Sequence, residues 1–175
     1  MCDVRAAGGY MKHAFACGLA AVLLASPAVA QSPRGGATAK QQAVLSCIEG
    51  VGVSTEWGQC LGLMFGACEG KEVGGAAHLG CLTEEYQGWQ IAMAGEREAL
   101  VEVLTATGAS ELTVLMGQWF GYVAQKCSAV AAQKDASVAQ VAQLGCEISE
   151  IAGVTAEFVA CRQRRSTAPY CVIQE

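Results

Sequence analysis

Cysteine is the residue type whose number and spacing in this chain point most directly to chemistry. The sequence contains ten cysteines, and paired cysteines serve as metal ligands, redox thiols or disulfides. Cys47 and Cys60 enclose twelve residues, and Cys68 and Cys81 enclose twelve more. No C-x-x-C occurs, although that spacing is typical of zinc, thioredoxin-type and c-type haem sites. The spacing therefore favours disulfides.

Disulfides require an oxidising compartment, and the first thirty residues predict export. Lys12 supplies a short positive region, residues 14–26 are apolar, and Ala28-Val29-Ala30 matches a signal-peptidase site. The apolar run is shorter than the roughly 20 residues that span a bilayer. We therefore expect residues 1–30 to be a signal peptide, with Met11 as an alternative start, and a periplasmic or secreted mature protein.

Removal of residues 1–30 takes away two of the ten cysteines, together with Arg5, Lys12 and Asp3, so the net charge of −5 becomes about −6. An acidic chain disfavours nucleic acid and anionic membranes and favours a basic protein partner. We expect no membrane span in the mature chain. The eight remaining cysteines are Cys47, Cys60, Cys68, Cys81, Cys127, Cys146, Cys161 and Cys171.

Apolar residues recur at helical spacing without sustained alternation, which predicts an all-α fold of about five helices. Two shorter helices, about 38–49 and 55–68, precede three long ones. The first long helix runs from Leu79 and ends at Gly108, Ser110 caps the second, and Ser137 caps the third. The expected buried face of the second comprises Leu112, Leu115, Trp119, Tyr122 and Val130.

Glycines recur every four residues inside two of these helices, at Gly58, Gly62 and Gly66 and again at Gly117 and Gly121. Each costs about 1 kcal/mol relative to alanine in a helix interior. We expect close approach of a neighbouring helix to compensate for this cost.

Four sequential cysteine pairs straddle four predicted turns almost symmetrically. In an antiparallel helical hairpin, residues equidistant from the turn lie opposite each other, within reach of a disulfide. Eight cysteines allow 105 connectivities, and this symmetry selects one. The expected disulfides join Cys47 to Cys60, Cys68 to Cys81, Cys127 to Cys146 and Cys161 to Cys171.

No catalytic constellation is visible. His78 is the single histidine of the mature chain, and there is no G-x-S-x-G, H-E-x-x-H or P-loop motif. The paired acids Glu84-Glu85 and Glu96/Glu98 suit acid–base chemistry in principle, but at helical positions we expect them to form a solvated face. We therefore expect neither an enzyme nor a metal or cofactor site.

The order of these elements resembles the LprI-like family of periplasmic lysozyme inhibitors over most of the mature chain. Three stretches carry the resemblance: CLTEEYQGW at 81–89, MGQWFGYVAQKC at 116–127, and LGCEISEI around Cys146. The family's polar positions differ here. They are occupied by Gln90, Met93-Ala94, Met116-Gly117, Val123-Ala124, Ile151 and Gly153.

The resemblance implies a helical LprI-like domain at 38–165, preceded by a flexible leader at 31–37. It implies binding and inhibition of a lysozyme, usually a basic protein; the alternative is a structural or scaffolding module of the cell envelope. Residues 166–175 form a tail tied by Cys171. The candidate partner-binding loop, between Cys68 and Cys81, contains Lys71, Glu72 and His78 around a flexible Gly74-Gly75 tip.

Three tryptophans are further candidates for an interface, where this residue type is enriched. Trp89 and Trp119 stand at helical spacing among apolar neighbours and are expected in the core. Trp57 stands near a turn.

Overall fold

Helices dominate the computed structural model, which describes residues 38–51, 55–63 and 68–175. The expected all-α class is confirmed for this part of the chain: four α-helices and one short 3₁₀ helix are connected by turns, with no strands. The elements are α1 (Ala39–Val51), η2 (Thr55–Cys60), α2 (Ala76–Val101), α3 (Ala106–Ala132) and α4 (Ala136–Arg162). No helix in the described ranges is long and apolar enough to cross a membrane. The expected signal peptide and leader, residues 1–37, lie outside them.

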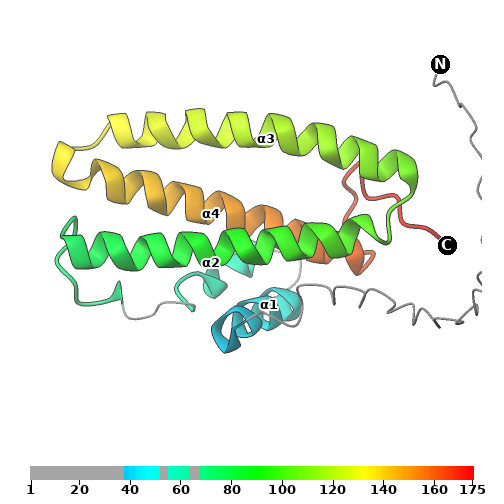
Figure 1. The fold of residues 1–175 in the computed structure, drawn as a ribbon, viewed down its shortest axis with the longest axis horizontal. Helices are drawn as coiled ribbons and strands as arrows, with labels where there is room; N and C mark the ends of the chain where they lie inside the picture. Colours follow the sequence, from blue (N-terminus) through cyan, green and yellow to red (C-terminus); the bar gives the residue numbers. More distant parts are fainter. Residues whose placement is uncertain (1–37, 52–54, 64–67) are drawn as a thin grey trace, which may run out of the picture. The chain divides into compact units, whose positions relative to one another are not determined.

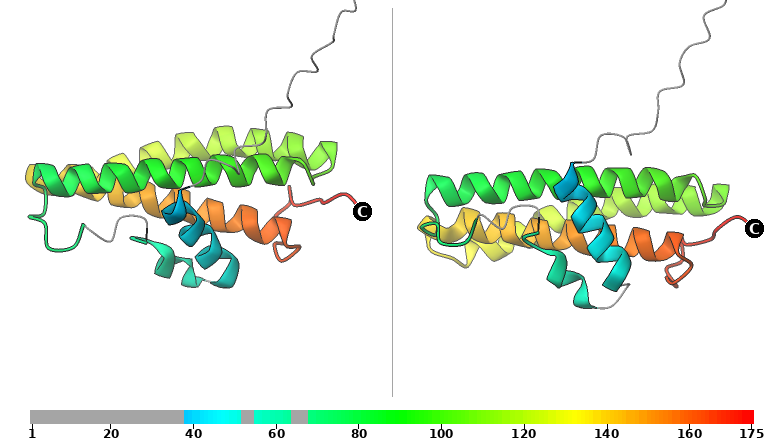
Figure 2. Two further views of the ribbon diagram at one scale, coloured as in Figure 1. Left: turned by 60° about the horizontal axis from the view of Figure 1, so that its bottom comes forward. Right: turned by 90° about the horizontal axis from the view of Figure 1, so that it is seen from below.

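Helix α4 is the element on which the others pack. It contacts α1, η2, α2 and α3, whereas α2 and α3 run along α4 rather than extensively along each other. Figure 1 shows the three long helices roughly side by side, and Figure 2 shows α1 crossing α2 and α4. Because α4 is covered on several sides, its second half is buried almost all round, at Ile148, Ile151, Ala152, Thr155, Ala156, Phe158, Val159, Ala160 and Cys161.

The core gathers apolar side chains from every helix. Trp89 of α2 and Phe158 of α4 are fully buried, as are Val44 and Ile48 of α1. Burial of each such side chain contributes about 1.5–3 kcal/mol. Thr155 is also fully buried, and its hydroxyl donates to the Ile151 carbonyl at 2.7 Å, which satisfies the polar group inside its own helix. Trp89 therefore lies in the core, as expected.

All four disulfides expected from turn symmetry are present, with Cα–Cα distances of 5.5–5.8 Å. Cys171 ties the C-terminal tail, as expected, and only one of the other three bonds joins two long helices of a hairpin. Cys127 in α3 and Cys146 in α4 join an antiparallel helix pair. The other three attach α1 to η2, the turn before α2 to α2, and the C-terminal tail to α4.

The helix expected at 55–68 is instead the six-residue 3₁₀ helix η2. It ends at Cys60, and Gly62 follows in a turn with φ of 79°. That left-handed conformation suits glycine and cannot continue a right-handed helix. Residues 64–67, including Gly66, lie outside the described ranges.

The boundary between α2 and α3 lies earlier than expected. Helix α2 ends at Val101, and Thr105 caps α3, its hydroxyl accepting from the Gly108 amide at 3.2 Å. Gly108 is therefore inside α3 rather than after α2, and Ser110 is not the cap. The C-terminal tail sets this boundary: the Thr105 amide donates to the Val172 carbonyl at 2.8 Å, and the Gln174 amide donates to the Val103 carbonyl at 2.9 Å.

The buried face of α3 differs from the expected one. Leu112 is buried, but Leu115 and Tyr122 are 40% and 56% exposed, and the other large buried side chains are Met116 and Val123. Cys127, which is bonded to Cys146 of α4, lies on the same buried side of α3 as Leu112, Met116 and Val123.

The glycines do not mark a close helix contact. A Cβ atom added at Gly58, Gly62, Gly117 or Gly121 would meet nothing within 4 Å. The expectation of close helix approach at these four positions is therefore wrong, because each faces open space.

Candidate functional site

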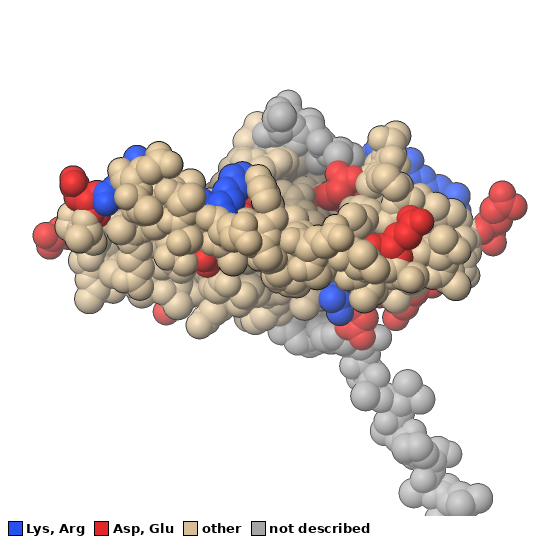
Figure 3. Space-filling model, turned by 90° about the horizontal axis from the view of Figure 1, so that it is seen from above, with Lys and Arg blue, Asp and Glu red and all other residues tan. Residues whose placement is uncertain are grey.

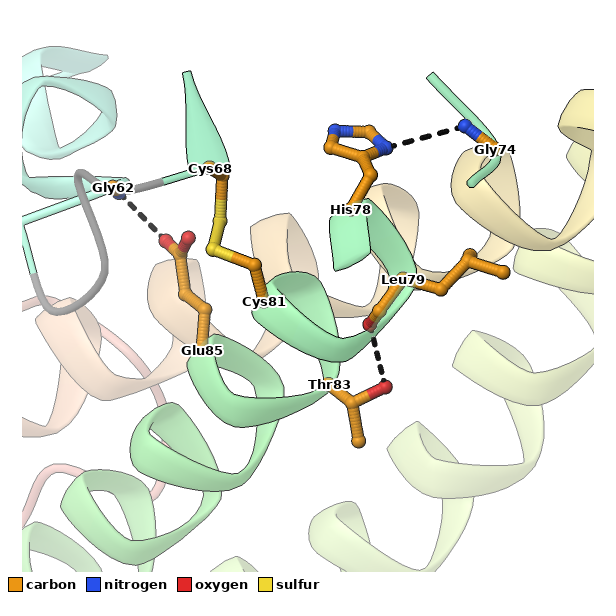
Figure 4. The surroundings of a disulfide bond; sticks show 8 residues. All are labelled: Gly62, Cys68, Gly74, His78, Leu79, Cys81, Thr83 and Glu85. Atoms are coloured by element: carbon orange, nitrogen blue, oxygen red, sulfur yellow. Dashed lines mark hydrogen bonds between the residues drawn. A yellow bond between two sulfur atoms is a disulfide. The ribbon is translucent and has the colours of Figure 1, made fainter. Parts of the chain in front are cut away.

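The disulfide between Cys68 and Cys81 closes the turn that leads into α2 (Figure 4). Backbone hydrogen bonds tighten this turn: the Lys71 amide donates to the Cys68 carbonyl at 3.4 Å, and the Gly75 amide donates to the Glu72 carbonyl at 3.0 Å. A turn held at both ends loses less conformational entropy on binding than a free segment. The cysteine bracket therefore presents a preorganised surface loop.

The three candidate residues of this loop occupy different environments. Glu72 is exposed, and Lys71 is partly exposed. His78 is also partly exposed, but its Nδ1 accepts a hydrogen bond from the Gly74 amide at 3.4 Å, as Figure 4 shows. The structure thus brings Lys71 and Glu72 together on the turn, while His78 helps to shape it.

The tip of the loop is not the flexible element expected from its two glycines. Gly74 has φ of 82°, and a Cβ atom there would lie 2.4 Å from the carbonyl oxygen of Ser137 at the start of α4. Only glycine permits this approach. The tip therefore packs against the first turn of α4, so the loop is restrained by tertiary contact as well as by its disulfide.

The acid pairs of α2 are not wholly solvated. Glu84 and Glu98 are exposed, as expected, but Glu85 and Glu96 are 5% and 8% exposed. Glu85 accepts a hydrogen bond from the Gly62 amide at 2.6 Å and so ties α2 to the segment after η2 (Figure 4).

Glu96 is held by Arg162 at the end of α4. The Nε and Nη2 atoms of Arg162 lie 3.0 Å and 2.8 Å from Glu96 Oε2, and the same Nη2 lies 3.5 Å from Glu49 of α1. Two of the four acids are therefore structural: Glu96 joins α2 to α4, and Glu85 joins α2 to the turn after η2. Neither acid pair is arranged as an exposed acid–base couple.

A pocket of about 150 Å³ opens between α2, α3 and α4. Its walls are aromatic and apolar, with one carboxylate and one amide: the lining residues are Tyr86, Gln90, Trp119, Phe120, Val123, Ala124, Glu147 and Ile151. Trp119, expected in the core, is half-buried here. Its ring centroid lies 5.1 Å from that of Phe120 in an edge-to-face arrangement.

In this pocket the carboxylate of Glu147, from α4, acts on the hydroxyl of Tyr86, from α2. Burial is the main cause that raises the pKa of the Tyr86 hydroxyl, and the negative charge of Glu147 raises it further. Both effects disfavour a tyrosinate. The pocket therefore contains a neutral phenol beside a carboxylate.

Sequence reasoning placed Trp119 on a core face and did not identify this pocket. A signal was available in the adjacent pair Trp119 and Phe120. Their side chains point about 100° apart on a helix, so a helix packed mainly along one side places them differently, as their half-buried and exposed positions show.

Uncharged residues dominate the face of the molecule formed by α3 (Figure 3). Over its 27 residues, this helix has two charged side chains, Glu111 and Lys126. Val114 and Phe120 are 59% and 49% exposed. Trp57, the third candidate tryptophan, packs instead beside Gly153 of α4, where an added Cβ would lie 3.4 Å from its ring.

Comparisons with known proteins provide no relative. No family model, curated protein or solved structure matches the chain. Within the described ranges, no three histidine, cysteine or acidic side chains are grouped so as to hold a metal ion.

Proposed function

We propose that this protein is exported to the periplasm or secreted, and that it binds and inhibits a basic lysozyme through the turn between Cys68 and Cys81. The observation that carries the proposal is the restraint of this turn. A disulfide and the contact of Gly74 with Ser137 hold it, while Lys71 and Glu72 remain accessible. The target follows from the resemblance of residues 81–89, 116–127 and the Cys146 segment to the LprI-like family.

The net negative charge of the mature chain supports binding of a basic lysozyme. The mature chain has a net charge of about −6, obtained from −5 by removing residues 1–30. An acidic protein meets a basic partner faster because complementary fields steer the encounter. Lysozyme cleaves glycosides with two carboxyl groups in a cleft, so the ammonium group of Lys71 would have a counter-charge there.

Export is supported by the cysteines. Four disulfides in one small domain are typical of oxidising compartments.

A scaffolding role in the cell envelope is the second candidate function. It is favoured by the exposed apolar side chains of α3, including Val114, Phe120 and Tyr122, because such groups mark interaction surfaces when they cluster. A scaffold would bind other envelope components without changing lysozyme activity.

A lysis assay separates the two functions. Lysozyme-driven clearing of a cell-wall suspension is followed with and without the purified oxidised protein, and with protein that has been reduced and alkylated. The inhibitor proposal predicts slower lysis with the oxidised protein alone. Unchanged lysis at a large molar excess of oxidised protein would reject it in favour of the scaffold.

Lys71→Ala tests whether the turn makes the contact. Loss of one charge-assisted contact worth roughly 1.5–3 kcal/mol should weaken inhibition about tenfold or more. The matched control is Lys134→Ala, which removes an exposed positive charge at the α3–α4 turn. Equal inhibition by both variants would move the interface away from residues 68–81.

A further inference from the structure

We propose that the pocket between α2, α3 and α4 binds a small organic ammonium ion. Its alkyl groups would lie against Tyr86, Trp119 and Phe120, and its charge near the carboxylate of Glu147. None of the residues that line this pocket belongs to the turn at residues 68–81, so the pocket can bind a cation whether or not that turn binds lysozyme.

The walls of the pocket have the composition that alkylammonium ions prefer. Tyr86 from α2 and the adjacent Trp119 and Phe120 from α3 all line it. Aromatic faces carry negative electrostatic potential and attract ammonium groups, with tryptophan the strongest. Three aromatic residues around one cavity favour a cation with an apolar shell over a simple hydrocarbon.

Glu147 supplies a full negative charge at the same place. The hydrogen bond described for its carboxylate comes from the neutral amide of Gln143, whose Nε2 lies 3.0 Å from Oε1. None of the described residues that line the pocket is basic. A carboxylate beside aromatic rings with a neutral partner leaves a charge that a bound cation would neutralise.

About one helical turn from the pocket, a carboxylate and an aromatic ring of this protein already hold an ammonium group. The Nζ atom of Lys126 lies 2.6 Å from Glu150 and 5.7 Å from the centre of the Tyr122 ring. A carboxylate of α4 and an aromatic ring of α3 thus share one cation. The pocket has the same combination, with Glu147 as the carboxylate of α4 and Trp119 and Phe120 as the aromatic rings of α3. None of the described residues that line it is a lysine.

The size and floor of the pocket limit the ligand. A volume of about 150 Å³ admits a molecule of roughly benzene size and is below the 300–1,000 Å³ typical of larger ligands. Val123 and Ile151 are buried and provide an apolar base. The pocket therefore fits a trimethylammonium or short alkylammonium group rather than an extended molecule.

Choline and its uncharged carbon isostere, 3,3-dimethylbutan-1-ol, are the probes. Each is titrated into the oxidised mature protein, and the indole signal of Trp119 is followed by NMR. Choline should shift this signal saturably and bind at least tenfold more tightly than the alcohol. Equal affinities would overturn the cation site, and so would no saturable shift with choline.

Glu147→Gln tests the charge, and Glu150→Gln is the matched control on the same helix. The first change should weaken choline binding about tenfold while leaving binding of the alcohol unaltered; the second should leave both unaltered. Equal weakening by the two variants would reduce the effect to general surface charge and overturn the proposal. If a variant fails to fold, the titrations of choline and of the alcohol into the unsubstituted protein still test whether the pocket prefers a cation.

A last arm asks whether the cation is free or part of a lipid. Co-sedimentation with phosphatidylcholine vesicles is measured with and without excess choline. The pocket as described predicts that free choline binds without vesicle retention. Retention that choline competes away would identify the same ammonium chemistry on a lipid headgroup.

Discussion

The contact between Arg162 and Glu96 shows how single residues tie this fold together. The carboxylate of Glu96 is buried, and the guanidinium reaches it with two nitrogens at 3.0 Å and 2.8 Å. Removing one partner of a buried pair leaves an uncompensated charge in a poor solvent, which costs far more than losing an exposed pair. This ion pair therefore contributes to stability mainly by satisfying a carboxylate that has little access to water.

Arg162→Ala should consequently lower the free energy of unfolding by about 3 kcal/mol, measured by urea denaturation of the oxidised protein. Arg162→Lys should recover part of the loss, because lysine keeps the charge but not the forked geometry. Lys126→Ala, which breaks the more exposed pair with Glu150, is the control and should cost much less. An equal loss in the two alanine variants would contradict a buried ion pair.

Tyr170 makes stability depend on alkaline pH. Burial, followed by the charge of Glu157, raises the pKa of its hydroxyl from 10.0 to about 12. The unfolded chain then loses this proton first, so the contribution of Tyr170 is complete below pH 10 and is lost as pH rises towards 12. Thermal unfolding should show a falling midpoint across this window.

Tyr170→Phe should flatten that decline, and Tyr122→Phe, at an exposed tyrosine, should leave it in place. A decline of the same size in all three proteins would assign it to other groups.

At the scale of the elements, the C-terminal tail decides where α3 begins. Gly108 is the third residue of α3, and a Cβ there would lie 2.6 Å from the Tyr170 carbonyl oxygen. The Thr105 amide pairs with the Val172 carbonyl at the same junction. The tail and the helix N-terminus therefore depend on a glycine that sequence reasoning assigned to the end of the preceding helix.

Two alanine substitutions in α3 should have opposite effects. Gly108→Ala forces the tail away and should destabilise the protein by about 1–3 kcal/mol. Gly117→Ala faces open space and should stabilise it by roughly 0.5–1 kcal/mol, because alanine loses less backbone entropy in a helix. Denaturant unfolding of both variants measures this difference; destabilisation by Gly117→Ala would show that α3 is packed there after all.

Local signals in the sequence predicted much of the fold. Helical periodicity and turn residues predicted helices where α2 and α4 lie, and they predicted the four disulfide pairs. The ends differ: α2 ends at Val101 rather than Gly108, and the N-cap of α4 is Asp135 rather than Ser137. The boundary at Thr105 was missed because it depends on Val172, far away in sequence. The outward positions of Leu115 and Tyr122 were missed because the expected face of α3 left out Cys127, which lies on the buried side with Leu112, Met116 and Val123.

The candidate sites, too, were predictable where they depend on local sequence and not where they depend on residues that are distant in sequence. The turn at residues 68–81 was visible as a bracket of cysteines and glycines, although its contact with Ser137 was not. The aromatic pocket draws residues from three helices, so no single stretch of sequence contained it. Burial of Glu85 and Glu96 likewise depends on Gly62 and Arg162, which come from other elements.

For the molecule as a whole, the proposed function pairs an acidic, disulfide-bonded helical domain with a basic partner. Charge complementarity acts mainly on the rate of encounter and is screened by salt, with a Debye length of about 10 Å at 0.1 M ionic strength. The restrained turn between Cys68 and Cys81 would then provide the specific contact. Because salt screens the attraction between the two proteins, we expect the complex to be strongest at low salt.

Binding of a basic lysozyme is measured by calorimetric titration of lysozyme into the oxidised mature protein, at low and at physiological ionic strength. We expect a saturable one-to-one complex whose affinity falls as salt rises and whose formation parallels inhibition of cell-wall lysis. Absence of a saturable complex at low salt, where attraction between the two proteins is greatest, would contradict the proposed function.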